Sequence, residues 1–130
     1  MRPLRVLMAI WDKNAEEFFR QGFKESGHSL TFMNPWRREE EFIKEVKRGE
    51  YDVILLTNLG LPGDLAVRLI APCRQADDAN VIVMSTLIDE NIKAGALREG
   101  AVGYYPLPLP YKDILGALEA AAEGAVIIKR

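Results

Sequence analysis

Stretches of continuous apolar residues alternate along the chain with stretches in which apolar residues recur at helical spacing. The continuous stretches predict strands covered on both faces, and the periodic ones predict amphipathic helices. The predicted strands span residues 6–10, 29–33, 52–57, 81–84 and 101–105, and the predicted helices span residues 15–26, 35–48, 62–72, 90–98 and 111–123. This alternation predicts an α/β domain with a doubly wound, five-stranded parallel sheet and right-handed crossovers.

Turn and capping residues predict where some helices begin and end. The first helix is expected to bury three aromatic rings, those of Phe18, Phe19 and Phe23. Gly27 is expected to end that helix, and Asn34 and Pro35 fit the N-cap and first position of the second. We expect Pro72 to bend or end the third helix because proline disrupts the hydrogen bonds of a helix interior.

Residues 124–130 follow the last predicted helix as a tail that is apolar from Ala125 to Ile128. An apolar segment of this kind needs a covering surface, either on the same chain or on another chain. We therefore expect residues 1–123 to form the domain and residues 124–130 to pack against a partner surface.

Composition excludes several function classes. The chain has 130 residues, of which 48% are hydrophobic and 28% charged, and this is typical of one soluble domain. No apolar run reaches the roughly 18 residues that cross a bilayer, and a net charge of −2 gives no overall attraction to nucleic acids or acidic membranes. The chain has a single cysteine, Cys73, which excludes an internal disulfide and suits a reducing compartment such as the cytoplasm. Cys73 is expected to be buried as a small apolar group. The single histidine, His28, is expected to be an exposed turn residue.

Ligand chemistry in an open parallel sheet gathers where the strands end at their carboxyl side. The residues leaving the first, third, fourth and fifth strands are Ile10-Trp11-Asp12, Thr57-Asn58, Ser85-Thr86 and Tyr105-Pro106-Leu107-Pro108. A phosphoryl-transfer site there needs clustered carboxylates for Mg²⁺ and a balancing cation. These residues offer one carboxylate, an amide and hydroxyls without a lysine, so the sequence predicts a poor phosphoryl-transfer site and no cofactor.

Three segments resemble the receiver domain of bacterial two-component response regulators. They are Leu97 to Pro108, with its Gly-Ala pair and terminal aromatic, the loop from Leu59 to Gly63, and the spacing from Trp11 to Gly27. The resemblance covers about Leu4 to Glu123. It implies a flavodoxin-like fold with strand order 2-1-3-4-5 and a role in phosphorelay signalling in the bacterial cytoplasm.

Matched residue by residue, the resemblance implies that the phosphorylation site has been lost. The two acidic metal ligands of the family fall on Ile10 and Trp11, the phosphorylated aspartate on Asn58 and the lysine before proline on Leu107. The hydroxyl residue is retained as Ser85, the switch aromatic as Tyr104, and Pro108 keeps the proline of the cis bond. This pattern is that of a degenerate receiver, or pseudo-receiver, in which Asp12 is at most a weak metal ligand.

A degenerate receiver is expected to act by protein–protein interaction rather than by catalysis. The resemblance implies a working surface on the fourth helix, fifth strand and fifth helix, where another signalling protein, an output domain or a second copy would bind. Its exposed candidates are Asp89, Glu90, Lys93, Arg98, Tyr104, Tyr105, Lys112 and Asp113.

The sequence also leaves room for other functions. The alternative is a small-molecule domain, cobalamin- or nucleotide-like, with a neutral pocket near Trp11, Asn58 and Ser85. The Asp-x-His-x-x-Gly loop of cobalamin-binding domains is absent. Trp11 could instead fill the space left by the missing acids, and the run from Trp36 to Arg38 is either an anion site or a solvated cluster at a helix start. A chain with one histidine and one cysteine assembles no catalytic triad.

Overall fold

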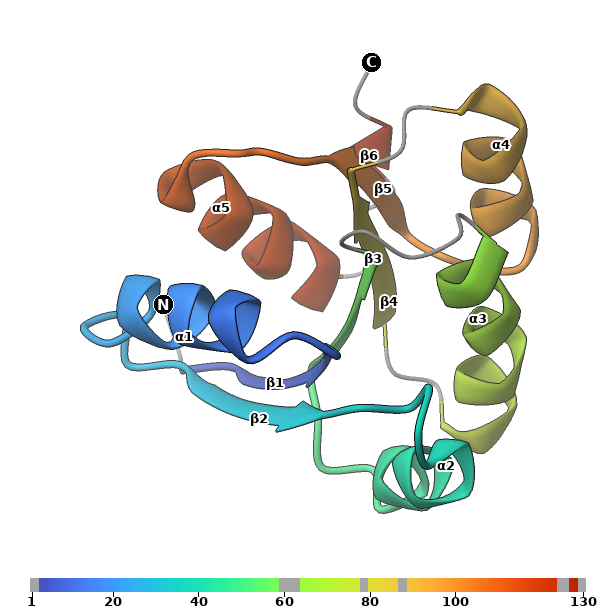
Figure 1. Cartoon of the computed structure of the whole chain (residues 1–130), viewed down its shortest axis with the longest axis horizontal. Coiled ribbons are helices and arrows are strands. Elements are labelled where there is room, and N and C mark those ends of the chain that lie inside the picture. Colours follow the sequence, from blue (N-terminus) through green and yellow to red (C-terminus); the bar gives the residue numbers. More distant parts are fainter. Residues whose placement is uncertain (1–2, 59–63, 78–79, 87–88, 124–126, 129–130) are drawn as a thin grey trace.

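The computed structural model describes residues 3–58, 64–77, 80–86, 89–123 and 127–128. A twisted parallel sheet lies between two layers of helices (Figure 1). The strands are β1 (Arg5–Ala9), β2 (Ser29–Met33), β3 (Val53–Asn58), β4 (Asn80–Ser85), β5 (Gly103–Pro106) and β6 (Ile127–Ile128). The helices are α1 (Lys13–Gly22), α2 (Glu39–Lys47), α3 (Asp64–Ala76), α4 (Glu90–Arg98) and α5 (Tyr111–Ala122).

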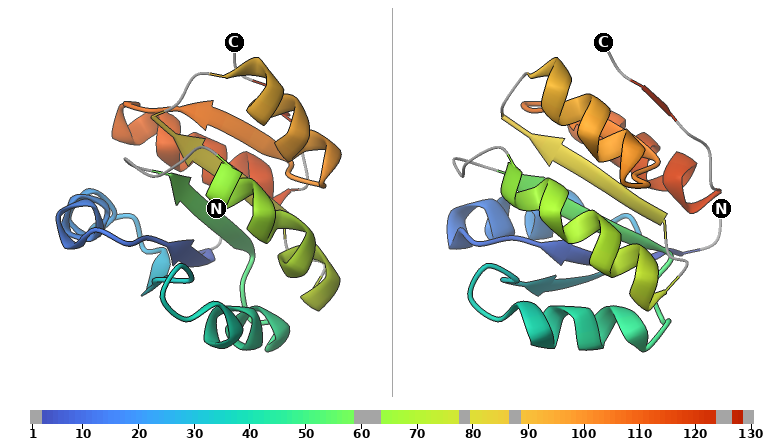
Figure 2. Two further views of the ribbon diagram at one scale, coloured as in Figure 1. Left: turned by 45° about the vertical axis from the view of Figure 1, so that its right-hand side comes forward. Right: turned by 90° about the vertical axis from the view of Figure 1, so that its right-hand side faces the viewer.

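The sheet has the order β2-β1-β3-β4-β5-β6, and every neighbouring pair is parallel (Figure 2). The predicted order 2-1-3-4-5 is therefore confirmed. The sixth strand was not predicted. It comes from the apolar tail, and Ile127 and Ile128 pair with Gly103 and Tyr104. The backbone of these two residues thus extends the sheet of the same chain, while Val126 lies outside the described residues.

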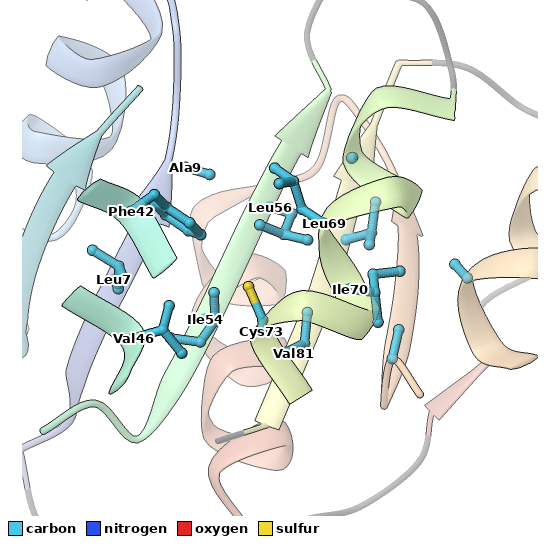
Figure 3. Close-up of a cluster of buried hydrophobic side chains, with 14 of the residues drawn as sticks. Leu7, Ala9, Phe42, Val46, Ile54, Leu56, Leu69, Ile70, Cys73 and Val81 are labelled. Atoms are coloured by element: carbon cyan, nitrogen blue, oxygen red, sulfur yellow. The ribbon is translucent and has the colours of Figure 1, made fainter. Parts of the chain in front are cut away.

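Each face of the sheet has its own core, because successive strand residues point to opposite sides. Leu7 and Ala9 of β1 join side chains of α2, α3 and α4, including Phe42, Val46 and Cys73 (Figure 3). Cys73 has an exposed fraction of 0%, as expected, and its burial raises the pKa of the thiol to about 12.

The second core lies under α1 and α5. Phe19 and Phe23 are buried there, but Phe18 is 48% exposed, so its predicted burial was wrong. The Phe18 ring instead stacks on Tyr111 with 4.8 Å between centroids, and the Tyr111 hydroxyl donates to the Phe18 carbonyl oxygen. Phe18 thus joins the two helices at the surface.

Local hydrogen bonds explain two of the helix boundaries that differ from the prediction. Helix α1 ends at Gly22, before Gly27, and the Ser26 hydroxyl donates to the Phe23 carbonyl oxygen (2.8 Å) in the turn that follows. Asn34 does not cap α2. Its side-chain oxygen accepts from the Trp36 amide (3.1 Å) and forms a turn, so that the helix begins only at Glu39.

Helix α3 continues through Pro72 to Ala76, so of the two expected effects the proline does not end the helix. Pro62 and Gly63, expected to open that helix, lie outside the described residues. One further expectation was wrong. His28 is not an exposed turn residue, because only 5% of its side chain is exposed and its Nδ1 accepts from the Leu4 amide (2.9 Å). None of the helices in the described ranges is long and apolar enough to cross a membrane.

Candidate functional site

The strand register brings the predicted site positions together at one edge of the sheet. Asn58 at the end of β3 pairs with Ser85 at the end of β4, and Ser85 pairs with Pro106. The Leu107 amide donates to the Ser85 carbonyl oxygen (2.8 Å). The side chain of Asn58 and the loop 59–63 lie outside the described residues.

Ile10 occupies the first of the two acidic positions implied by the resemblance. It is 4% exposed and packs in the core under α1 and α5. Its amide donates to the Met33 carbonyl oxygen (2.8 Å), which fixes the chain as it leaves β1. An apolar side chain therefore fills this position.

Trp11 occupies the second position and behaves differently. It is 44% exposed, so its indole is not enclosed in the core. Because Ile10 and Trp11 are consecutive in an extended segment, they point to opposite sides, and the core takes Ile10. The indole is left at the surface beside the start of α1.

Asp12 is the one carboxylate that leaves β1, and it caps α1. Its Oδ1 accepts from the Asn14 amide (2.8 Å), a bond that satisfies one of the free amides at the helix start. Within the described ranges, no group of three His, Cys, Asp or Glu side chains is placed to hold a metal ion.

The retained polar and aromatic positions are buried. Ser85 is 1% exposed and Tyr104 is 3% exposed. Leu107 is half-buried, and its bond to Pro108 is cis, as predicted. Ser85 is too buried to line an open pocket of the kind expected near Trp11, whereas the adjacent Thr86 is exposed.

An uncharged hollow of about 270 Å³ lies between α1 and the segment before α5. It is lined by Ala15, Phe18, Phe19, Thr86, Leu107, Pro108 and Leu109. Leu107, at the position of the family's lysine, thus contributes to an apolar surface.

The predicted partner surface is only partly exposed. Glu90, Arg98, Lys112 and Asp113 are exposed. Lys93 is 8% exposed and Tyr105 is 3% exposed, so both, like Tyr104, were wrongly predicted as exposed. Lys93 shares the sheet-facing side of α4 with Ala96, and the two tyrosines lie on a strand with a core on each face.

The side chain of Asp89 is also committed to the fold. Its Oδ1 accepts from the Asn91 and Ile92 amides, at 2.8 and 3.2 Å, and caps α4. Asp89 is therefore less available to a partner than the four exposed residues.

The sequence interpretation missed that Trp11 lies beside Lys13 and Arg37. These three side chains line a hollow of about 210 Å³ at the ends of β1 and β2. The signal was present: β2 is the neighbour of β1 in the predicted order, so the residues that leave both strands must meet. The predicted site positions include the exits of the first, third, fourth and fifth strands but not that of the second.

No protein-family model and no curated protein sequence matches this chain. Solved structures do match. A LuxR-family response regulator from Aurantimonas sp. SI85-9A1 has a TM-score of 0.82 at 18% identity, over 98% of this chain and 90% of the other. A response regulator from Burkholderia pseudomallei, described with a phosphorylated aspartic acid, calcium ion and citrate, has a TM-score of 0.75 at 21% identity, over 93% and 69%.

The beryllofluoride-activated NtrC4 receiver domain dimer has a TM-score of 0.78 at 21% identity, over 92% of this chain and 97% of the other. At these identities the similarity defines the fold. This chain has the fold of response-regulator receiver domains, which confirms the fold class predicted from its sequence.

Proposed function

We propose that this chain is a degenerate receiver domain that transmits signals in the bacterial cytoplasm by binding another protein, without accepting a phosphoryl group. The observation that carries the proposal is the burial of Ile10 in the core at the position of an acidic metal ligand. A buried alkyl side chain supplies no oxygen to Mg²⁺, which requires oxygen ligands.

The neighbouring positions support the same proposal. Asp12 is engaged as a helix cap, and Leu107 lines an uncharged hollow. The Burkholderia regulator carries a phosphorylated aspartic acid, whereas the matching position here is Asn58, and a carboxamide is a poor nucleophile. Loss of the acids together with the lysine leaves no buried charge without a partner, so the site stays compatible with a stable fold.

The partner is another signalling protein, an output domain or a second copy of the chain. The NtrC4 receiver domain is described as a dimer, which supports association of such domains with each other. We place the contact on α4, β5 and α5, at the exposed residues Glu90, Arg98, Lys112 and Asp113. The domain itself contacts neither nucleic acid nor membrane in this proposal.

Incubation of the pure protein with acetyl phosphate and Mg²⁺, followed by mass spectrometry of the intact chain, tests the loss of phosphorylation. The expected mass is unchanged. A stable gain of one phosphoryl group would overturn the proposal.

Sedimentation of the full chain over a range of concentrations tests the surface. If a second copy is the partner, Arg98→Glu combined with Lys112→Glu weakens dimerisation about tenfold or more, because interface charges set orientation and encounter. Lys24→Glu, an exposed charge after α1, is the matched control and leaves the dimer unchanged. Equal effects of the two sets of changes would exclude this surface.

The second candidate function is small-molecule binding. One observation favours it: the indole of Trp11 is 44% exposed on the wall of a hollow that also contains two cationic side chains.

A further inference from the structure

The hollow at the ends of β1 and β2 combines an aromatic wall with positive charge. Its lining residues are Ile10, Trp11, Asp12, Lys13, Glu16, Phe32, Met33, Asn34 and Arg37. Trp11 is one of two large hydrophobic side chains that are exposed in the described part of the chain. Lys13 and Arg37 are 24 positions apart in sequence but line the same space, since β1 and β2 are paired.

The two acids in this hollow do not cancel its positive charge, because Glu16 is paired with Arg20 and only Asp12 remains against Lys13 and Arg37. Glu16 accepts from Arg20 at 3.0 Å, and Arg20 lies over the Phe32 ring. Asp12 accepts the Asn14 amide as a helix cap. By contrast, no described carboxylate lies within salt-bridge distance of Lys13 or Arg37. The remaining charge on the wall therefore favours an anion.

A second hollow of about 380 Å³ adjoins the first. It is lined by Met33, Asn34, Arg37, Arg38 and Glu41, and it shares Met33, Asn34 and Arg37 with the first. Arg37 stands where the two spaces meet. Within the second hollow Arg38 is paired with Glu41 at 3.3 Å, so the uncompensated charge there is again that of Arg37.

We propose that this double hollow binds a mononucleotide, with the base stacked on the Trp11 indole and the phosphate held by Lys13 and Arg37. A 5′-phosphate carries close to two negative charges at neutral pH, which two cationic side chains match. Aromatic faces stack on nucleobases with little preference for sequence, and a guanidinium holds phosphate oxygens in a fixed fork. The proposal deepens the second candidate function and does not depend on the protein-binding role.

Alternative occupants fit less well. Inorganic phosphate has no ring to stack on the Trp11 indole. An uncharged aromatic ligand has no anionic group for Lys13 and Arg37 to bind. A nucleoside monophosphate engages both the indole and the two cationic side chains.

The test is titration of the full chain with AMP and GMP, followed by tryptophan fluorescence and by amide chemical shifts. Saturable binding is expected, with shifts at residues 10–16 and 33–38. Arg37→Gln should weaken AMP binding about tenfold or more, because a charge-assisted phosphate contact is lost. Lys44→Gln, an exposed cation on α2 outside both hollows, is the matched control and should leave the affinity unchanged.

A second variant separates stacking from charge. Trp11→Ala should weaken AMP binding about tenfold while it changes the binding of inorganic phosphate less than about twofold, because only the base uses the indole. Circular dichroism confirms that each variant is folded. Absence of saturable binding at millimolar AMP, or equal losses in Arg37→Gln and Lys44→Gln, would overturn the proposal. The acetyl phosphate experiment tests only the loss of phosphorylation. Its result therefore does not decide whether the chain binds a mononucleotide, and the AMP titration does not decide whether the chain is phosphorylated.

Discussion

The ring of Tyr111 occupies the space that a side chain on Gly22 would need. A Cβ on Gly22 would lie 1.6 Å from Cε1 of Tyr111, so α1 and α5 approach each other over a position that admits only hydrogen. Tyr111 also stacks on Phe18 and meets Phe23 edge-on with 6.1 Å between centroids. This single glycine therefore allows an aromatic cluster to join the two helices.

Gly22→Ala should destabilise the domain by about 2 kcal/mol, because the added methyl displaces Tyr111 and costs its ring contacts. The free energy of unfolding in urea measures the effect. Gly116→Ala is the matched control: Gly116 lies within α5 with no atom within 4 Å of a built Cβ, so alanine there should stabilise by about 0.5–1 kcal/mol. A neutral Gly22→Ala would contradict this packing argument.

Stability at acid pH should depend on Glu45 and Tyr51. The Tyr51 hydroxyl donates a hydrogen bond to Glu45 Oε2 at 2.5 Å. This bond is the main reason that the pKa of Glu45 lies below its usual value near 4.5. Burial of Glu45 raises its pKa, and the nearby Arg48 lowers it further. The unfolded chain then binds more protons than the folded one below that pH. The stabilisation is therefore present above about 4.5 and is lost as pH falls through the lowered pKa.

Tyr51→Phe should cost about 1.5–3 kcal/mol at pH 7, the range for a hydrogen bond to a charged acceptor, and clearly less at pH 3. Urea denaturation at both pH values measures the difference. Tyr111→Phe is the control, since its hydroxyl donates to a backbone carbonyl that does not titrate in this range. A penalty for Tyr51→Phe that is independent of pH would exclude the linkage.

Restoring the acceptor alone should not restore phosphorylation. In Asn58→Asp the chain would still carry Ile10 and Leu107 at the positions that the resemblance assigns to an acidic metal ligand and to the lysine, and these supply neither a metal ligand nor a cation. We expect no mass gain with acetyl phosphate and Mg²⁺. Phosphorylation of this variant would show that Ile10 and Leu107 are not what disables the site.

Removal of the tail should increase self-association. A chain that ends at Glu123 lacks β6 and leaves the β5 edge at Gly103 and Tyr104 unpaired, and exposed strand edges recruit other chains. Light scattering should report a larger mean mass than for the full chain, whereas removal of Lys129 and Arg130 alone should change nothing. A dimeric full chain that became monomeric on truncation would place the tail within the interface instead.

Much of the fold could be predicted because apolar runs such as Val53 to Leu56 are fully buried and therefore continuous in the sequence. The bounds of α4 were predicted correctly, since Asp89 caps its start and Gly100, with φ of 111°, follows its end. The start of α2 was predicted wrongly, because Asn34 fits a helix cap and a turn equally well. A two-residue strand such as β6 is too short to leave a periodic signal.

The residues of the site could be predicted by position but not by orientation. The sequence indicates that Ile10 and Trp11 replace acidic side chains, yet which of them faces the core depends on the sheet. Burial of Lys93 likewise depends on how α4 is rotated against the sheet, since its aliphatic stem can lie along an apolar surface. The hollow at Lys13 and Arg37 requires two loops to meet, which local pattern alone does not reveal.

The consecutive tyrosines of β5 have a mechanical consequence. Tyr104 packs in the core that α2, α3 and α4 share, and Tyr105 packs in the core of α1 and α5, where its ring covers Gly103 at 2.7 Å from a built Cβ. A displacement of this four-residue strand along its axis would move a large ring in each helical layer at once. The strand therefore ties the two helical layers together through one large ring on each face.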